Sequence, residues 1–198
     1  MNPSITMPDT LPRSRLSGRL QLLLILAIVI GPMVLATAMY YGKFWLPQSR
    51  SYHGELLATG ENLDSLGVSD AADKRWQLLV TAPNDCADDC KKLVFLARQI
   101  NIGLNREATR ATHTLATSQP ISHEYNNQLK REYPQLTQHA LQLTHYQKTL
   151  EHTGAKAAEA QLWIVDPHGN LVLRYDSSNT GKEALKDLLY MLKLSRIG

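Results

Sequence analysis

The sequence predicts an α/β sandwich that follows a single membrane-spanning helix. Three observations point to it: an uncharged apolar run near the N-terminus, short apolar stretches typical of buried strands, and apolar residues at helical spacing between them. The 198 residues are enough for one ordinary domain and an appendage. With 43% hydrophobic and 20% charged residues, the composition is that of a globular protein.

The charge pattern argues against nucleic-acid binding. The net charge is only +3, and part of the excess lies in an N-terminal tail with Arg13, Arg15 and Arg19. Elsewhere the sequence has no Lys/Arg cluster interleaved with aromatic residues, so we expect no nucleic-acid partner. It also lacks a Gly-rich phosphate loop and the Ser/His/Asp signature of a hydrolase.

Residues 20–42 are expected to anchor the chain in a lipid bilayer. The run from Leu20 to Ala38 carries no charge and is long enough to cross a hydrocarbon core of about 30 Å. Aromatic residues suited to the headgroup region follow it, among them Tyr41. Arginines precede the run and few positive charges follow it, which places residues 1–19 in the cytoplasm and the rest of the chain outside.

A cleaved signal peptide is the competing interpretation. Ala36-Thr37-Ala38 matches an A-x-A cleavage site. The apolar run is longer than the roughly 7–15 residues of a signal peptide, so we expect an uncleaved anchor. Both interpretations export the C-terminal domain.

The exported part is expected to start with a linker. Residues 43–74 carry Pro, Gly, Ser and Asp and show little periodicity. Trp76–Ala82 then predicts a buried strand, and Asn84 or Asp85 can cap a helix that ends near residues 103–105. The apolar stripe of this helix consists of Leu93, Leu96, Ala97, Ile100 and Leu104.

The middle of the domain is less clearly patterned. Residues 111–116 alternate loosely and predict a second strand. Residues 121–133 predict a helix that Pro134 stops. Residues 135–158 are polar and rich in His and Gln, and their pattern fits either a helix or a strand.

The C-terminal part predicts a hairpin and a helix. Leu162–Val165 and Leu171–Tyr175 flank a turn rich in Pro, Gly and Asn. Thr180–Glu183 is a capping box that opens the last helix. The order strand, helix, strand, helix, hairpin, helix over residues 75–198 predicts an α/β sandwich of thioredoxin type. The apolar face of the last helix is expected to be Leu185, Leu188, Leu189 and Leu192.

Cys86 and Cys90, the only cysteines, are the strongest candidates for chemistry. At a strand-to-helix junction of an exported domain they can form a disulfide or hold a metal. A helix N-terminus stabilises thiolate, which attacks disulfides and binds Cu(I) or Zn(II). Asp85, Asp88 and Asp89 oppose thiolate formation but attract a cation, which favours metal over a strongly oxidising disulfide.

A structural role for the two cysteines stays open as an alternative interpretation. The cysteines can form a plain stabilising disulfide, although so short a loop removes little entropy from the unfolded chain.

Each of the seven histidines is expected on the solvated surface. His152 precedes the hairpin strand and could fold back towards the cysteines, but its spacing does not require this.

Several motifs occur together in a known family. They are the membrane anchor, His53–Leu57 shortly after it, Cys86-x-x-x-Cys90 after a strand, and Asp166–Gly169 in the late hairpin. In these motifs the chain resembles the Sco/SenC family of copper proteins, which help to assemble cytochrome c oxidase. It is more specifically similar to a divergent branch of thioredoxin-like, oxidase-associated membrane proteins. The branch motifs are Trp76–Pro83 and Lys186–Gly198, and the likeness covers about residues 40–198.

The resemblance implies that Cys86 and Cys90 are metal ligands. The third copper ligand of the family is a histidine that precedes the hairpin motif, and this chain has Ala158 there, so His152 or another histidine would have to replace it. Two thiolates suit Cu(I) but not Cu(II), which prefers nitrogen and oxygen ligands. Thioredoxin-type oxidoreductases carry a cis-proline before the hairpin strand. This sequence has no proline just before that strand, which weakens the hypothesis of a general oxidoreductase.

The preferred hypothesis is an accessory factor in cytochrome c oxidase biogenesis, anchored in a bacterial inner membrane with its domain in the periplasm. Cys86 and Cys90 would bind Cu(I), or reduce a disulfide in a copper-site partner, either an oxidase subunit or another copper-assembly factor. A periplasmic thiol-disulfide oxidoreductase and a non-catalytic scaffold with a structural disulfide are the alternatives. Whether the protein is an enzyme is left open by the sequence.

Overall fold

The chain consists of two units, which are described separately. The computed structural model describes residues 18–42, 52–57, 60–69, 73–154, 159–179 and 181–195. The units are Met1–Ser49 and Arg50–Gly198. Most of the expected cytoplasmic tail lies outside the described residues, as do Ala158 and Thr180 of the expected capping box.

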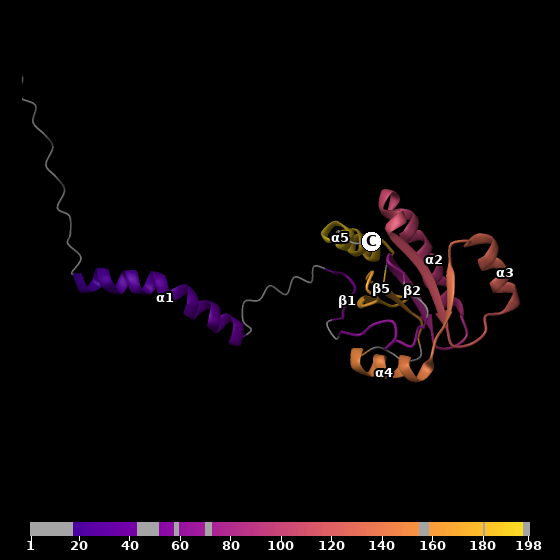
Figure 1. The fold of residues 1–198 in the computed structure, drawn as a ribbon, viewed down its shortest axis with the longest axis horizontal. Coiled ribbons are helices and arrows are strands. Elements are labelled where there is room, and N and C mark those ends of the chain that lie inside the picture. The colour runs from indigo at the N-terminus through magenta and orange to yellow at the C-terminus, as the bar shows by residue number, and fades with distance from the viewer. Residues whose placement is uncertain are drawn as a thin grey trace, which may run out of the picture. The chain divides into compact units, whose positions relative to one another are not determined.

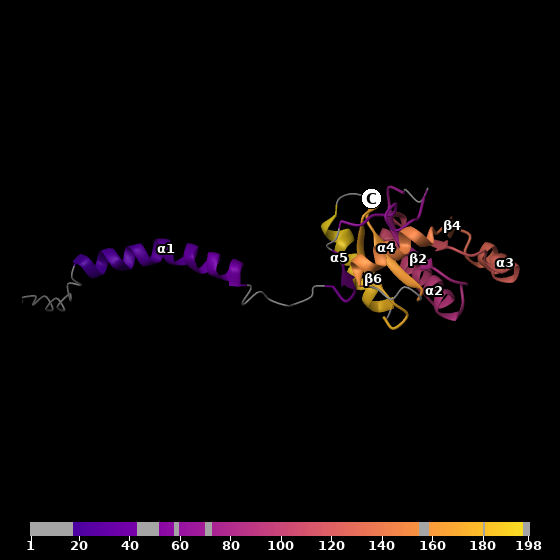
Figure 2. The same ribbon diagram turned by 90° about the horizontal axis from the view of Figure 1, so that it is seen from below.

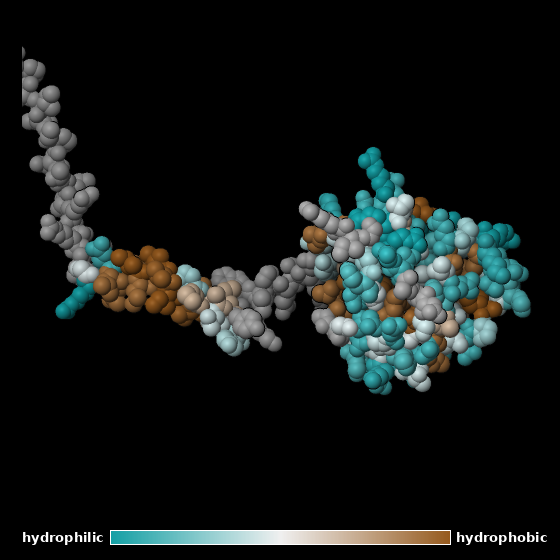
Figure 3. All heavy atoms as spheres, in the orientation of Figure 1, coloured by the Kyte–Doolittle hydropathy of each residue, from teal (hydrophilic) through white to brown (hydrophobic). Residues whose placement is uncertain are grey.

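The first unit contains one long apolar helix. Helix α1, Gly18–Gly42, has 25 residues and includes Pro32. Its leucine, isoleucine and valine side chains are exposed and form the apolar band of Figure 3. Among the described helices, α1 alone has a stretch, Gly18–Met39, long and apolar enough to cross a membrane, a property that a signal sequence shares.

The second unit is built on a six-stranded sheet in the order β1-β6-β5-β2-β3-β4 (Figure 1). Strands β2, β3 and β4 are parallel, whereas β5 is antiparallel to β2 and the outer strands β6 and β1 continue in antiparallel fashion. The strands are Glu55–Leu56 (β1), Trp76–Ala82 (β2), Ala111–Thr117 (β3), Thr137–Ala140 (β4), Gln161–Val165 (β5) and Leu171–Tyr175 (β6).

Helices cover both faces of this sheet. In Figure 1, α2 (Asp88–Gly103) and α5 (Gly181–Leu194) lie on one side of the strands and α4 (Leu143–Thr153) on the other. The 3₁₀ helix Asn105–Arg110 connects α2 to β3, and α3 (His123–Glu132) lies beyond the β4 end of the sheet in Figure 2.

The core therefore has two halves, one on each face. Alternate residues of β2 serve the two halves because successive side chains of a strand point to opposite faces. Leu78 and Val80 pack with the α2 and α5 side, whereas Leu79 packs with Trp163 and with Tyr146 of α4.

The structure agrees with most of the expected elements. The strand at Trp76–Ala82, the helix ending at Gly103 and the late hairpin are present as expected. The stretch 135–158, which fitted either pattern, contains both a strand, β4, and a helix, α4.

Two details of the helices differ from expectation. Ala87, and not Asn84 or Asp85, is the N-cap of α2, and no side chain caps the helix. On α5, Leu189 is 37% exposed. Successive helix residues lie about 100° apart, so the turn that buries Leu188 against the sheet carries Leu189 outward. The buried residues of α5 are Ala184, Asp187, Leu188, Met191 and Leu192.

Much of the segment expected to be a linker belongs to the folded domain. Leu63, Leu66 and Val68 are buried in the α4 half of the core. The Leu63 backbone N–H bonds Gly169 of the hairpin at 2.9 Å, and Val68 forms a bridge with Leu141. Residues 60–69, here called the strap, pack mainly as turns. Their sequence therefore shows no helix or strand periodicity.

One buried carboxylate ties the start of the domain to its last helix. Oδ2 of Asp187 accepts hydrogen bonds from the backbone N–H groups of His53 (2.7 Å) and Gly54 (3.0 Å) and from the Tyr175 hydroxyl (2.7 Å). Oδ1 lies 2.9 Å from Nδ1 of His53. Only glycine fits at position 54, because a Cβ there would lie 2.5 Å from the Tyr175 ring.

These contacts control the ionisation of Asp187, which is 2% exposed. Burial acts to raise the pKa of the carboxyl, but the hydrogen bonds from His53, Tyr175 and Gly54 outweigh it and lower the pKa below its ordinary value. The carboxylate form is therefore the one that stabilises the fold.

We expect Asp187→Asn to lower the free energy of unfolding at neutral pH by about 2–3 kcal/mol, because hydrogen bonds to a buried charge are lost. Since the folded-state pKa is lowered, this stabilisation is present above the ordinary carboxyl pKa of about 3.9 and is lost as the pH falls through the lowered value. Denaturant unfolding of the full chain in mild detergent measures the difference. Asp64→Asn, at an exposed carboxylate, is the matched control. An equal loss in both variants, or a loss in Asp187→Asn that persists unchanged in acid, would contradict the assignment.

Candidate functional site

The two cysteines form a disulfide at the start of α2. Their Cα atoms are 5.0 Å apart, and the bond closes over the first turn of the helix. Cys90 is 2% exposed and packs in the core, whereas Cys86 is only partly buried against it. The two sulfurs therefore differ in their access to solvent.

The N-terminus of α2 exerts opposing electrostatic effects on the cysteine sulfurs. Ala87 leaves the first backbone N–H groups without a side-chain cap, and such groups stabilise negative charge on a nearby sulfur. Asp88 and Asp89 occupy the first turn, and with the exposed Asp85 they oppose that effect. The nearby Lys91 ammonium lies 5.2 Å from the centre of the Tyr125 ring.

Hydrogen bonds within the turn that carries Cys86, and hydrogen bonds from Ser118 to the residues before it, hold this turn in place. The Ala87 backbone N–H donates to the Asp85 carbonyl at 2.8 Å. The Ser118 hydroxyl, just after β3, donates to the Pro83 carbonyl, and the Ser118 N–H donates to Ala82. Ser118 was not recognisable from the sequence, because it meets the turn only through the parallel pairing of β2 with β3.

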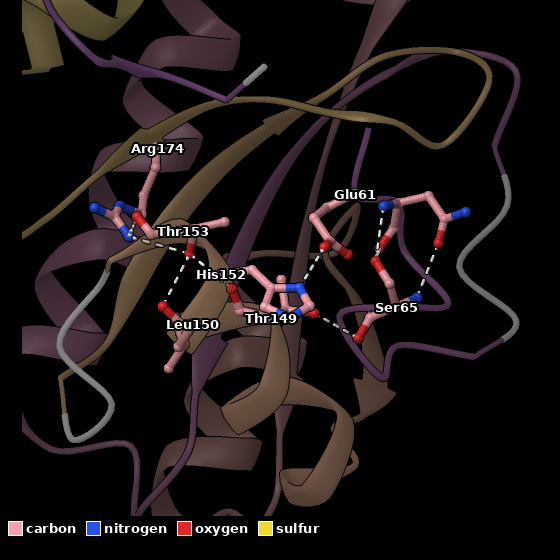
Figure 4. A network of polar contacts seen from close by, with 8 residues as sticks. Glu61, Ser65, Thr149, Leu150, His152, Thr153 and Arg174 are labelled. Atoms are coloured by element: carbon pink, nitrogen blue, oxygen red, sulfur yellow. Dashed lines mark hydrogen bonds and ion pairs between the residues drawn. The ribbon is translucent and has the colours of Figure 1, made fainter. Parts of the chain in front are cut away.

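His152 does not join the cysteines. It lies on α4, on the face of the sheet opposite α2, and its Nδ1 is 3.1 Å from the Glu61 carboxylate (Figure 4). In the same network the Thr149 hydroxyl donates to the Ser65 carbonyl. These contacts fix the strap to α4. The sheet lies between His152 and the sulfurs, so the structure does not bring this candidate third ligand to the cysteines.

The other histidines do not supply a third ligand either. His168 is exposed in the hairpin turn, as expected. His113 is 4% exposed, so its expected surface position is wrong; it lies on β3, on the same face as Leu115, which packs in the α2 half of the core. Within the described part of the chain, no three His, Cys, Asp or Glu side chains come close enough to hold a metal ion.

The arrangement supports two kinds of chemistry. Oxidised, Cys86 and Cys90 are a disulfide with one accessible sulfur. Reduced, they are one thiol just before α2 and one in its first turn, which fit a two-coordinate Cu(I) ion but not Cu(II), since no nitrogen ligand accompanies them among the described residues.

Two family models match the sequence. Residues 76–195 match the model described as "Transmembrane-like, thioredoxin-like, C-terminal domain", which confirms the expected thioredoxin-like fold. Residues 12–43 match "Transmembrane-like, N-terminal domain". Together with α1, the second match indicates a single-pass membrane protein.

Solved structures with a similar arrangement are distant in sequence. A copper-bound Sco protein of Arabidopsis thaliana is 8% identical, with 63% of this chain and 88% of that chain covered and a TM-score of 0.49. Yeast Sco1 is 11% identical, with 63% and 83% covered and a TM-score of 0.46. The thioredoxin domain of a thiol-disulfide oxidoreductase from Bacteroides vulgatus is 15% identical, with 70% and 97% covered and a TM-score of 0.43. Comparison with curated proteins finds no match.

Proposed function

The chain belongs to the family of transmembrane-like proteins with a thioredoxin-like C-terminal domain, and from this premise we propose that Cys86 and Cys90 exchange electrons with a disulfide in a partner protein. The observation that carries the proposal is the difference between the two sulfurs. Cys86 is reachable from solvent at an uncapped helix N-terminus, whereas Cys90 is buried directly behind it. Thiol-disulfide exchange needs this pairing of an attacking and a resolving thiol.

The reaction runs in two steps that balance. The Cys86 thiolate of the reduced protein attacks one sulfur of the partner disulfide, which forms a mixed disulfide and releases one partner thiolate. The Cys90 thiolate then attacks the Cys86 sulfur and releases the second partner thiolate, which leaves the Cys86–Cys90 disulfide. Two electrons pass to the partner, and a dithiol of another protein has to reduce the pair again.

The proposed setting is the outer side of a bacterial inner membrane, with the N-terminus in the cytoplasm. The arginines before α1 and the scarcity of basic residues just after it support this orientation. The sequence motifs shared with oxidase-associated copper proteins support a partner in cytochrome c oxidase biogenesis, either a copper-site subunit or another copper-assembly factor.

We expect Cys90→Ser to form a stable mixed disulfide with oxidised glutathione at Cys86, because the resolving thiol is missing. Mass spectrometry of the full chain in detergent detects the adduct. Wild-type protein is expected not to accumulate it. Cys86→Ser is the matched variant, and it should react at least about tenfold more slowly because Cys90 is buried. Equal rates in the two single variants would contradict the assigned roles.

A second candidate function is the handling of Cu(I). It is favoured by one observation: the Cα atoms of the two cysteines are 5.0 Å apart at the start of α2, and Asp85, Asp88 and Asp89 lie next to them in the sequence. Thiolates are preferred ligands of Cu(I), and the acidic groups attract a cation.

Reduced full-length protein is expected to bind one Cu(I) in competition with a colorimetric chelator, and Cys86→Ser and Cys90→Ser are each expected to lose it. His152→Ala should retain binding, because His152 lies across the sheet. Binding that persists in either cysteine variant, or that His152→Ala abolishes, would rule out a two-thiolate site.

A further inference from the structure

A second concave region lies at the opposite end of α2 from the cysteines. Two adjoining hollows of about 460 Å³ and 230 Å³ share Asn101, His113 and Gln135 in their walls. Asn101 lies in the last turn of α2, eleven residues beyond Cys90, or about 16 Å along a helix that rises 1.5 Å per residue. The hollows are therefore separate from the redox site, and their combined size suits a small organic molecule.

His113 gives this region a polar group without a partner. The residue is 4% exposed, and it lines both hollows. Its Nε2 atom is buried and has no hydrogen-bond partner among the described residues. Buried polar atoms are nearly always hydrogen-bonded, so an orphaned ring nitrogen in a cavity wall indicates a place for a ligand atom.

The His113 ring is neutral at physiological pH. Burial first, and then the positive charge of Arg98, lower its pKa below the ordinary value. A neutral imidazole can donate one hydrogen bond to a ligand oxygen without adding a charge.

Arg98 supplies a positive charge to the walls that no described carboxylate bonds directly, although its charge also acts on the Glu132 carboxylate. Its guanidinium lies 5.2 Å from the centre of the Tyr133 ring, and within the described part of the chain it bonds no carboxylate. Arg75, the other basic residue of the walls, is held by Asp73 at 2.6 Å. The acidic Glu132 is bonded by Gln128 and Arg131.

We propose that these adjoining hollows bind a small organic monocarboxylate, with its carboxylate between Arg98 and His113. One cation that no described carboxylate bonds directly and one neutral donor fit a single negative charge better than the double charge of a phosphate. Ala108, Ile102 and Pro134 provide apolar wall for the organic part. Asn101 is fixed by its hydrogen bond to the Ala111 carbonyl at 2.9 Å, so this part of the wall is preformed.

The test is a titration of the full chain in detergent with propionate, against inorganic phosphate at matched ionic strength. The imidazole NMR signal of His113, identified by its loss in His113→Gln, should move and saturate with propionate and stay in place with phosphate. Arg98→Gln should weaken propionate binding at least about tenfold, because a charge-assisted contact is lost. Arg106→Gln, an exposed arginine outside the walls, should leave it unchanged.

Titration calorimetry of the Arg98→Gln and Arg106→Gln variants gives the same comparison without a change at the buried His113. A shift that does not saturate, equal binding in the two arginine variants, or binding of phosphate as tight as that of propionate would each overturn the proposal.

Discussion

Strand β2 is buried along all seven of its residues, and the position of the chemistry follows from this constraint. One side of the strand packs under α2 and α5, and the other side packs against α4. A strand covered on both faces reaches solvent only at its end, and here Asn84 is the first exposed residue after it. Because α2 covers one face, the chain must turn back at once, so Cys86 and Cys90 lie where the turn becomes the helix. This geometry makes the first sulfur accessible and buries the second.

The same face of the sheet connects the cysteines with the point where the chain enters the domain. His53 and Gly54 bind the buried carboxylate of Asp187 on α5. Helix α5 in turn packs on α2, since Leu185 fills the space beside Gly103. The start of the domain and the helix that carries Cys90 therefore share one packed layer, whereas His152 and its network belong to the other.

The sequence predicted those parts of the fold that depend on local pattern. Trp76–Ala82 and the late hairpin were recognisable because a buried strand is a short apolar run. Cys86 and Cys90 were recognisable as a pair because the chain has only two cysteines, although their acidic neighbours favoured a metal and the structure has a disulfide. The Leu63–Val68 strap was not recognisable, since its few core residues have no strand or helix period.

Contacts between residues that are far apart in the sequence could not be predicted from it. His53 and Asp187 are 134 residues apart, and nothing in the pattern of either marks the pair. His113 was expected at the surface because histidine is usually exposed, but the β3 register places it under α2. His152 was expected as a possible ligand from its place in the sequence. In the structure the sheet lies between His152 on α4 and the cysteines at the start of α2.

We propose that the Cys86–Cys90 disulfide is a working redox pair and does not serve only to stabilise the fold. Its reduction potential, measured on the full chain in detergent against thiol-disulfide buffers with alkylation and mass spectrometry as the readout, tests this most directly. A working pair is expected between about −270 and −120 mV, the range of thiol-disulfide exchange proteins. A disulfide that stays oxidised below about −300 mV, as structural disulfides do, would contradict the account.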